Sequence, residues 1–205
     1  MNIEEQLSAY GDVECNEPLA KHTTFRIGGS CAYFVYPKNE ICLIRIITIC
    51  QNNQLPYRIF GKGSNLLCSD DRYEGVILCL DRYMNEIYFE QDGCCIAQAG
   101  CSIILLAHEA MKRSFTGLEF ASGIPGTLGG ALYMNAGAYR CAIADVLKEV
   151  YVYKDHACAW MNVEELDYGY RHSRFQSERD WIILAGRLQL EKGDQSEIMA
   201  LMDSR

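Results

Sequence analysis

Long apolar runs and basic stretches are both missing from this sequence. No apolar run reaches the roughly 20 residues that a helix needs to cross a bilayer, and residues 1–10 are acidic where a signal peptide carries positive charge. The 205 residues hold 19 Lys and Arg against 27 Asp and Glu, a net charge of -8, with no basic stripe. These absences argue against nucleic-acid and anionic-membrane partners, and they favour a cytoplasmic protein.

The sequence also lacks a C-x-x-C pair, although it contains 11 cysteines. Zinc sites and disulfide frameworks are therefore poor interpretations of the cysteine spacing. Four of the cysteines, Cys42, Cys50, Cys68 and Cys79, lie inside apolar runs. We predict that the cysteines are reduced thiols acting as small hydrophobic side chains, and we predict no metal site.

The first part of the chain has the pattern of a small α/β unit. After a polar N-terminal segment, strands are predicted at 31–36 and 56–60. Between them, Asn39 can cap a helix whose apolar residues Ile41, Ile44, Ile47 and Cys50 recur at helical spacing. This order predicts a right-handed crossover between parallel strands. With a further strand at 76–80, residues 1–80 are predicted to form one subdomain.

The second part, residues 81–205, has the pattern of an α+β subdomain. Residues 86–90 and 95–99 flank the turn signal Gln91-Asp92-Gly93, which indicates an antiparallel hairpin. A helix at 102–113, a glycine-rich stretch at 117–137 and strands at 146–154 and 181–190 follow. Asp194 and Glu197 then signal a helix start, and no stop signal precedes Arg205. The chain therefore looks interrupted, and the alternative is a frayed C-terminal helix.

A loop with two glycines directly follows the predicted strand at 56–60. Its sequence is Gly61-Lys62-Gly63-Ser64-Asn65-Leu66-Leu67. The glycines let the backbone approach a ligand, successive N–H groups can bind an anion, and Ser64 and Asn65 add hydrogen-bonding side chains suited to a pyrophosphate. The loop is neither a P-loop nor a Rossmann fingerprint, so a tight turn is the alternative interpretation.

A second loop, residues 121–131, contains four glycines and a proline. Ordering each glycine costs about 0.5–1 kcal/mol more than ordering alanine, so something must require the bare backbone. A flat cofactor lying against the main chain would require it. The alternative is a helix that packs tightly against a sheet through Gly129 and Gly130.

Five motifs, taken together in order and spacing, resemble the UDP-N-acetylenolpyruvoylglucosamine reductase family in the shorter of its two types. They are residues 16–19 (NEPL), 22–29 (HTTFRIGG), 61–67 (GKGSNLL), 117–127 (GLEFASGIPGT) and 134–139 (MNAGAY), and the resemblance covers essentially the whole chain. It implies a mixed α/β and α+β chain with the two-subdomain FAD-binding fold of the vanillyl-alcohol-oxidase/PCMH type. The family uses noncovalent FAD, with NADPH as hydride donor, to reduce UDP-N-acetylenolpyruvoylglucosamine to UDP-N-acetylmuramate for peptidoglycan synthesis.

The same resemblance implies which residues would form the site. Arg171, in the segment 168–173 (YGYRHS), is at the position of the family's catalytic arginine, where a fixed guanidinium would stabilise negative charge on the substrate carboxylate. The implied cofactor-binding residues are Thr23, Thr24, Gly61, Gly63, Ser64, Asn65, Leu66, Ser122, Gly123, Ile124, Pro125, Gly126, Thr127, Asn135, Ala136 and Gly137.

The sequence departs from the family pattern after residue 205. The domain that binds the UDP-sugar, the serine that protonates the intermediate and an assisting glutamate normally follow, so we expect the chain alone to be inactive, or to be completed by a separate C-terminal fragment. Two alternatives stay open. One is a non-catalytic flavin-binding remnant or interaction module. The other is an oxidase with covalent FAD attached to His22, although we interpret His22 as a polar surface histidine.

Overall fold

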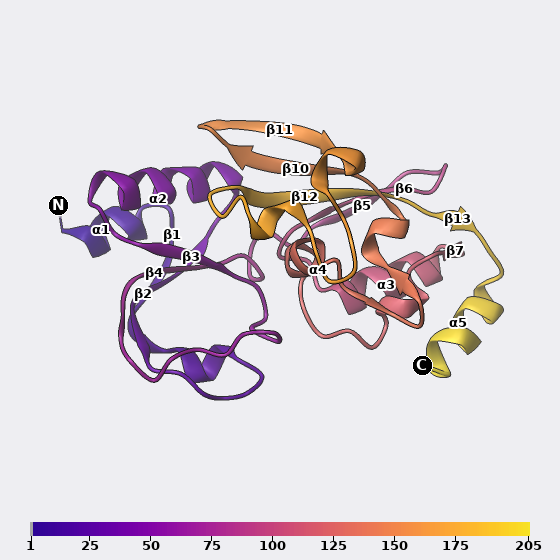
Figure 1. The fold of residues 1–205 in the computed structure, drawn as a ribbon, viewed down its shortest axis with the longest axis horizontal. Helices are drawn as coiled ribbons and strands as arrows, with labels where there is room; N and C mark the ends of the chain where they lie inside the picture. Colours follow the sequence, from indigo (N-terminus) through magenta and orange to yellow (C-terminus); the bar gives the residue numbers. More distant parts are fainter. Residues whose placement is uncertain (1) are drawn as a thin grey trace. The chain divides into compact units, whose positions relative to one another are not determined.

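The computed structural model describes residues 2–205, and the chain separates into two compact units, Met1–Met84 and Asn85–Arg205 (Figure 1). Each unit has its own sheet. None of the described helices is long and apolar enough to cross a membrane.

The first unit is built on a four-stranded mixed sheet in the order β1-β2-β4-β3. Strands β2 and β3 both run parallel to β4, which lies between them, and β1 pairs antiparallel with β2. The predicted parallel strands are therefore confirmed, with β4 inserted between them. The elements are α1 (Ile3–Ser8), β1 (Gly11–Pro18), a 3-10 turn (Leu19–His22), β2 (Ser30–Pro37), α2 (Glu40–Asn52), β3 (Tyr57–Phe60) and β4 (Tyr73–Cys79).

Two features of this unit differ from the prediction. The polar N-terminal segment forms both α1 and β1. Asn39 does cap α2, but Ile41 is 71% exposed, and the helix buries Leu43, Ile46, Ile47 and Cys50. Apolar residues occur nearly all round this helix, so spacing alone did not show which face would meet the sheet.

A cluster of buried side chains joins the 3-10 turn to strands β2, β3 and β4. Phe34 is fully buried at its centre, with its ring 6.2 Å from that of Phe60 in an edge-on contact. This packing fixes the ends of the strands from which the pocket described below is built. The cluster contains Leu19, Cys31, Phe34, Tyr36, Phe60, Ile77 and Cys79.

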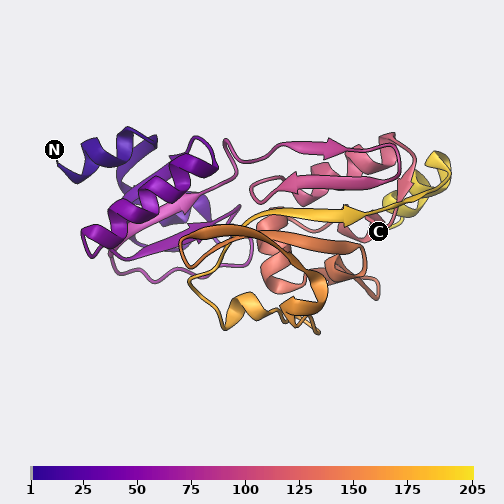
Figure 2. The same cartoon turned by 90° about the horizontal axis from the view of Figure 1, so that it is seen from above.

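The second unit is built on a five-stranded antiparallel sheet in the order β11-β10-β12-β6-β5. Figure 2 shows β12 lying between β10 and β6. The predicted hairpin is present as β5 and β6, and the sequence prediction missed β11. The elements are β5 (Ile87–Phe89), β6 (Cys94–Gln98), α3 (Ile103–Lys112), β7 (Phe115–Thr116), α4 (Leu128–Met134), β8 (Gly137–Ala138), β9 (Cys141–Ala142), β10 (Leu147–Lys154), β11 (Ala157–Asn162), β12 (Ile182–Gln189), β13 (Glu191–Lys192) and α5 (Gln195–Asp203), with short 3-10 turns between them.

Several cysteines are part of the two cores. Cys31, Cys50, Cys79, Cys95 and Cys101 are all buried, which agrees with the predicted role as small hydrophobic side chains. Burial raises the pKa of Cys50 to about 11 and that of Cys95 to about 12, so both stay protonated near neutral pH. Cys15 and Cys141 are exposed and do not fit that role.

Candidate functional site

Two loops of the first unit meet through their backbones. The loop that follows β3 contains Gly63, whose φ of +61° is left-handed, and a Cβ atom placed there would lie 2.0 Å from the carbonyl oxygen of His22. The N–H of Thr24 donates to the carbonyl oxygen of Gly63 at 3.2 Å. Glycine at position 63 is therefore needed for the loops to join at all.

A concave pocket of about 440 Å³ opens where these loops meet the ends of β2 and β4. Lys21, Arg26 and Lys62 bring three positive charges to it, against the single carboxylate of Asp81. Such a pocket suits an anionic group, because cations and hydroxyl groups converge on it. Its lining residues are Lys21, His22, Thr23, Thr24, Arg26, Tyr36, Gly61, Lys62, Cys79 and Asp81.

Only some of the cofactor-binding residues predicted in this unit line the pocket. Gly61 and Thr24 line the pocket. Thr23 lines it too, but it is only 5% exposed and its hydroxyl donates to the carbonyl oxygen of Ile27 at 3.1 Å, which closes a turn. Gly63, Ser64, Asn65 and Leu66 are not among the lining residues, although all four belong to the loop.

The sequence analysis missed most of the charged residues of the pocket. Lys21 and Arg26 flank Thr23 and Thr24, and Lys62 lies inside the glycine loop. Their closeness to these motifs could have indicated that they belong to the site. Asp81 and Cys79 come from the end of β4 and carry no such signal, because only the fold brings them to the pocket.

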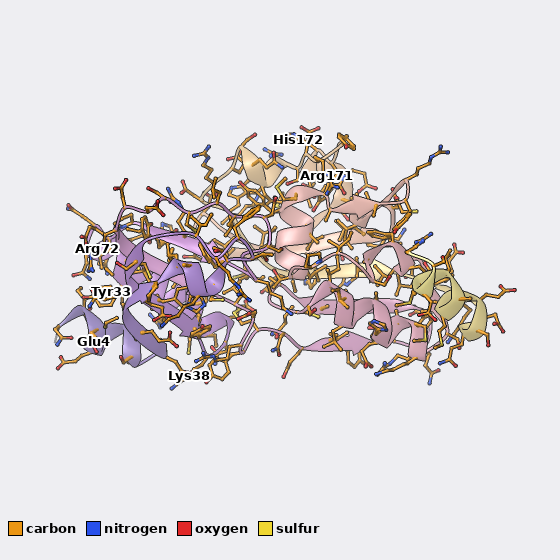
Figure 3. All side chains as sticks on the ribbon, turned by 90° about the horizontal axis from the view of Figure 1, so that it is seen from below. Glu4, Tyr33, Lys38, Arg72, Arg171 and His172 are labelled. Carbon is orange, nitrogen blue, oxygen red and sulfur yellow. The ribbon has the colours of Figure 1, made fainter. Side chains whose placement is uncertain are left out.

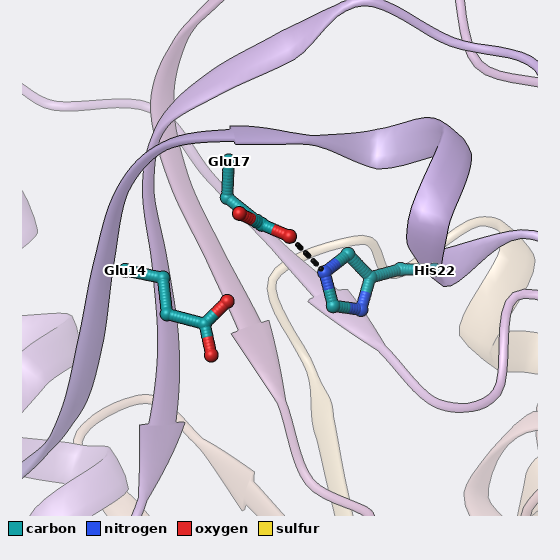
Figure 4. Close-up of side chains that lie close together, drawn as sticks. All are labelled: Glu14, Glu17 and His22. Atoms are coloured by element: carbon teal, nitrogen blue, oxygen red, sulfur yellow. Dashed lines mark hydrogen bonds and ion pairs between the residues drawn. The ribbon is translucent and has the colours of Figure 1, made fainter.

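His22 is more buried than the predicted surface histidine, although it still lines the pocket. Its side chain is 19% exposed, its ring stacks on Phe34 with centroids 4.0 Å apart, and its Nε2 lies 3.0 Å from Oε1 of Glu17 (Figure 4). Burial disfavours ionisation of Glu17, but hydrogen bonds from His22 and Lys21 outweigh it, so the pKa of Glu17 lies below its ordinary value. The turn Leu19–His22 places the His22 ring against Phe34, and the local sequence did not reveal this contact.

Glu14, Glu17 and His22 also offer ligand atoms that lie within 4.8 Å of one another. The sequence predicted no metal site, whereas this arrangement is the kind that metal ligands form. Lys21 lies 3.2 Å from Glu17, and Arg82 lies 3.7 Å from Glu14. These cations already neutralise both carboxylates, which argues against a bound metal here.

The glycine-rich stretch of the second unit forms α4, so the helix alternative for Gly129 is correct. The N–H of Gly129 donates to the carbonyl oxygen of Ala99 at 2.8 Å, and a Cβ atom on Gly129 would lie 3.0 Å from that of Ala99. Gly130 does not share this role, because a Cβ atom there meets nothing closer than Oγ1 of Thr127, at 3.6 Å. Only one of the two glycines is required by packing.

The residues just before α4 differ in what they can offer a ligand. Thr127 is 4% exposed, and its hydroxyl accepts from the N–H of Gly130 at 3.3 Å. The Ser122 hydroxyl donates to the carbonyl oxygen of Glu119 at 2.9 Å. A Cβ atom on Gly123 would meet nothing within 4 Å, so the backbone of the stretch Ser122, Gly123, Ile124, Pro125 and Gly126 is open at Gly123.

Arg171 lies on a tight loop of the same unit, next to His172 (Figure 3). Its φ of +54° is left-handed, a conformation that costs a non-glycine residue roughly 1–3 kcal/mol and is often found at functional sites. Its Nη2 donates to the carbonyl oxygen of Gly137 at 3.0 Å. The structure therefore brings Arg171 together with the predicted segment Asn135, Ala136 and Gly137.

A buried hydroxyl group accompanies this loop. Tyr168 Oη has no hydrogen-bond partner among residues 2–205, and burial raises the pKa of the phenol above its ordinary value. A buried polar atom left in this way marks a place where water or a ligand atom can bind.

Comparison with known proteins bears on the family and the fold of this chain. The FAD binding domain family matches residues 31–156. UDP-N-acetylenolpyruvoylglucosamine reductase of Anoxybacillus flavithermus is 39% identical over 97% of this chain and 66% of its own length. The chain thus spans just under two thirds of the length of that curated relative, and 64% of the one from Bacillus subtilis.

Solved structures show the same fold. The crystal structure of UDP-N-acetylenolpyruvylglucosamine reductase from Thermus caldophilus has a TM-score of 0.77 and 29% identity, over 95% of this chain and 67% of that one. Cholesterol oxidase from B. sterolicum shares the fold alone, with a TM-score of 0.61 and 16% identity, over 89% of this chain and 38% of that one. The predicted FAD-binding fold is confirmed. The chain belongs to the FAD binding domain family and is a homologue of the UDP-N-acetylenolpyruvoylglucosamine reductases.

Proposed function

We propose that this chain binds FAD noncovalently and takes part, in the cytoplasm, in the NADPH-dependent reduction of UDP-N-acetylenolpyruvoylglucosamine to UDP-N-acetylmuramate, a step of peptidoglycan synthesis. The observation that carries the proposal is the cation-lined pocket beside Gly61, in a chain of the FAD binding domain family. The relatives named for this reaction support the choice of substrate.

The residues of the first unit fit the pyrophosphate of FAD. A pyrophosphate carries negative charge that Arg26 and Lys62 can balance, and the hydroxyl of Thr24 and the backbone at Gly61 add hydrogen-bonding groups. Ser64, Asn65 and Leu66 continue the same loop and are proposed to contact the dinucleotide further along it. Gly63 contributes indirectly, by allowing the loop to reach His22.

In the second unit, the open backbone at Gly123 is proposed as the place where the flat flavin ring approaches. Ser122, Ile124, Pro125, Gly126 and Thr127 shape that stretch. Thr127 does so as the residue that caps α4, since its hydroxyl is already bonded to Gly130. Ala136 and Gly137, just beyond the end of α4, are also proposed to contact the cofactor, through their backbone.

The proposed role of Arg171 follows from the charge that the reaction produces. When bound, FAD supplies the hydride transfer from NADPH to the enolpyruvyl group. The guanidinium of Arg171, held on the carbonyl oxygen of Gly137, would bind the substrate carboxylate and stabilise the negative charge that develops there. Fixed donors of this kind are typically worth about 3–4 kcal/mol.

The experiment that tests the proposal begins with titration of the purified protein with FAD, followed by flavin fluorescence. Micromolar binding is expected, and Lys62→Ala should weaken it, whereas Lys148→Ala, an exposed lysine on β10, should not. Absence of binding in folded protein would contradict the assignment of the pocket. Acid precipitation then separates the two modes of attachment, because noncovalent flavin is released and covalent flavin stays with the protein.

The loaded protein is next mixed anaerobically with NADPH and then with UDP-N-acetylenolpyruvoylglucosamine. Loss of the oxidised flavin absorbance with NADPH, and its return with substrate as UDP-N-acetylmuramate forms, is the expected result. FAD binding without either change would favour the alternative of a non-catalytic flavin-binding module.

A further inference from the structure

The end of α4 is joined to the Arg171 loop by the side chain of Asn135. Its Nδ2 donates to the carbonyl oxygen of Gly169 at 2.8 Å, and its Oδ1 accepts from the N–H of Ala144 at 3.3 Å. The residue is 8% exposed. Both ends of the amide bond within the protein and the residue is buried, so little of the side chain is left for a cofactor.

The acceptor of this bond is part of the turn that carries Arg171. Gly169 and His172 exchange two backbone hydrogen bonds, each of 3.1 Å, with Arg171 between them. The carbonyl oxygen of Gly169 thus receives both the His172 N–H and the Asn135 amide. The Asn135 side chain holds the base of the turn.

The same segment also holds the tip of the arginine. Gly137, two residues after Asn135, accepts the hydrogen bond from Nη2 of Arg171 at 3.0 Å. Asn135 has a φ of +46° and ends α4, and the chain then leads directly to Gly137. The turn that carries Arg171 is therefore bonded to Asn135, and its guanidinium is bonded to Gly137 two residues further on.

We propose that Asn135 is a positioning residue for Arg171 and not a flavin ligand. An arginine on an exposed loop is mobile, and it stabilises developing charge best when its position is set before the charge appears. Asn135 fixes the position of Arg171 through its hydrogen bond to Gly169, at the base of the turn. The consequence for catalysis rests on the function proposed above, whereas the positioning of the loop does not.

The variant Asn135→Asp isolates the bond in question. Aspartate has nearly the same shape, tolerates the left-handed backbone and keeps an oxygen for the Ala144 N–H, but it cannot donate to Gly169. Asn162→Asp is the matched control, because it makes the same change at an exposed residue of the same unit, next to the 3-10 turn Val163–Leu166. Asn135→Gly, which also suits the left-handed conformation, serves if the aspartate variant folds poorly.

Amide hydrogen exchange of Gly169 and His172 gives the direct readout on the FAD-loaded protein. In Asn135→Asp both amides are expected to exchange at least about tenfold faster, with the FAD dissociation constant within about twofold of the parent. The limiting rate of flavin reoxidation by substrate should fall about tenfold to a hundredfold, while the rate of reduction by NADPH is unchanged. Asn162→Asp should match the parent in every measurement.

Unchanged exchange at Gly169 and His172 in both Asn135 variants would overturn the proposal. So would a loss of FAD affinity as large as the loss of reoxidation rate, because that result would identify Asn135 as a cofactor ligand. Failure of the proposed function looks different. In that case the parent protein itself is not reoxidised by substrate, and the hydrogen exchange still decides whether Asn135 holds the loop.

Discussion

Gly63 lies directly against the backbone of His22, so closely that a Cβ atom on the glycine would be 2.0 Å from the His22 carbonyl oxygen. Side chains at this position would push apart the two loops that form the cation-lined pocket. The left-handed φ of +61° at Gly63 adds a second obstacle, because β-branched residues rarely adopt it.

Gly63→Val is therefore expected to weaken FAD binding by at least about tenfold and to lower the unfolding temperature, since the clash involves backbone that cannot rotate away. Titration with FAD and thermal unfolding of the unliganded protein are the measurements. Binding equal to that of the parent would show that the 61–63 and 22–24 loops are not both needed for the cofactor.

Gly123 gives the opposite case, because a Cβ atom there meets nothing within 4 Å. We expect Gly123→Ala to leave the free energy of unfolding within about 0.5 kcal/mol of the parent. FAD affinity should nevertheless fall several-fold, because only the flavin would meet the added methyl group. Unchanged affinity would place the ring elsewhere in the second unit.

Gly129 and Gly130 provide a matched pair within α4. Gly129→Ala should destabilise the protein by about 1–3 kcal/mol, because its methyl group would press on Ala99 in a packed interface. Gly130→Ala should stabilise it by up to about 1 kcal/mol, since alanine favours the helix and has room there. Urea unfolding monitored by circular dichroism compares the two. Equal effects would mean that helix propensity, and not the contact with Ala99, governs both positions.

Local signals predicted the element boundaries well. Asn39, Ser102 and Asp194 each accept a hydrogen bond from the first turn of the helix that they begin, as short polar residues do at this position. The turn at 91–93 likewise joins two antiparallel strands. These features depend on a few neighbouring residues, so the sequence alone contains them.

Features that depend on partners distant in the chain were not predicted. Strand β1 exists because it pairs with β2, and half of its own residues are acidic side chains or asparagine. The exposed Ile41 shows the same limit, since the sheet decides which face of α2 is buried. In the candidate site, motif similarity pointed to Thr24 and Gly61, whereas Tyr36 and Asp81 reach the pocket only through the packing of β2 and β4.

The lowered pKa of Glu17 leads us to expect that the stability of the protein depends on pH. Its folded-state pKa is depressed, because the hydrogen bonds from His22 and Lys21 outweigh the effect of burial, so the ionised carboxylate stabilises the fold above its ordinary pKa of about 4.5. That stability is lost as the pH falls from about 4.5 through the lower folded-state pKa.

Glu17→Gln should therefore destabilise the protein by about 1–2 kcal/mol at pH 7, and the difference from the parent should shrink toward pH 3. Urea unfolding at a series of pH values measures it. Glu191→Gln, an exposed residue on β13, is the control and should follow the parent. A difference that stays constant down to pH 3 would show that Glu17 is not stabilised by these hydrogen bonds.

Arg171 gives the prediction closest to the chemistry. Because its guanidinium bonds to Gly137 and is proposed to act on substrate charge, Arg171→Ala should leave the FAD dissociation constant within about twofold of the parent. The rate of flavin reoxidation by UDP-N-acetylenolpyruvoylglucosamine should fall by about 10²- to 10³-fold, as expected when a fixed donor to a developing charge is removed.

Arg174 is the matched control for this loss, being an exposed arginine three residues away whose guanidinium lies 5.0 Å from the ring of Trp181. Arg174→Ala should leave the reoxidation rate within about twofold of the parent. Anaerobic stopped-flow absorbance separates the two half-reactions, and reduction by NADPH should be the same in both variants and in the parent. If Arg171→Ala instead lost flavin and reoxidation rate to the same degree, the arginine would be supporting the fold around Gly137 and not the reaction, since only an interaction with the substrate leaves cofactor binding intact.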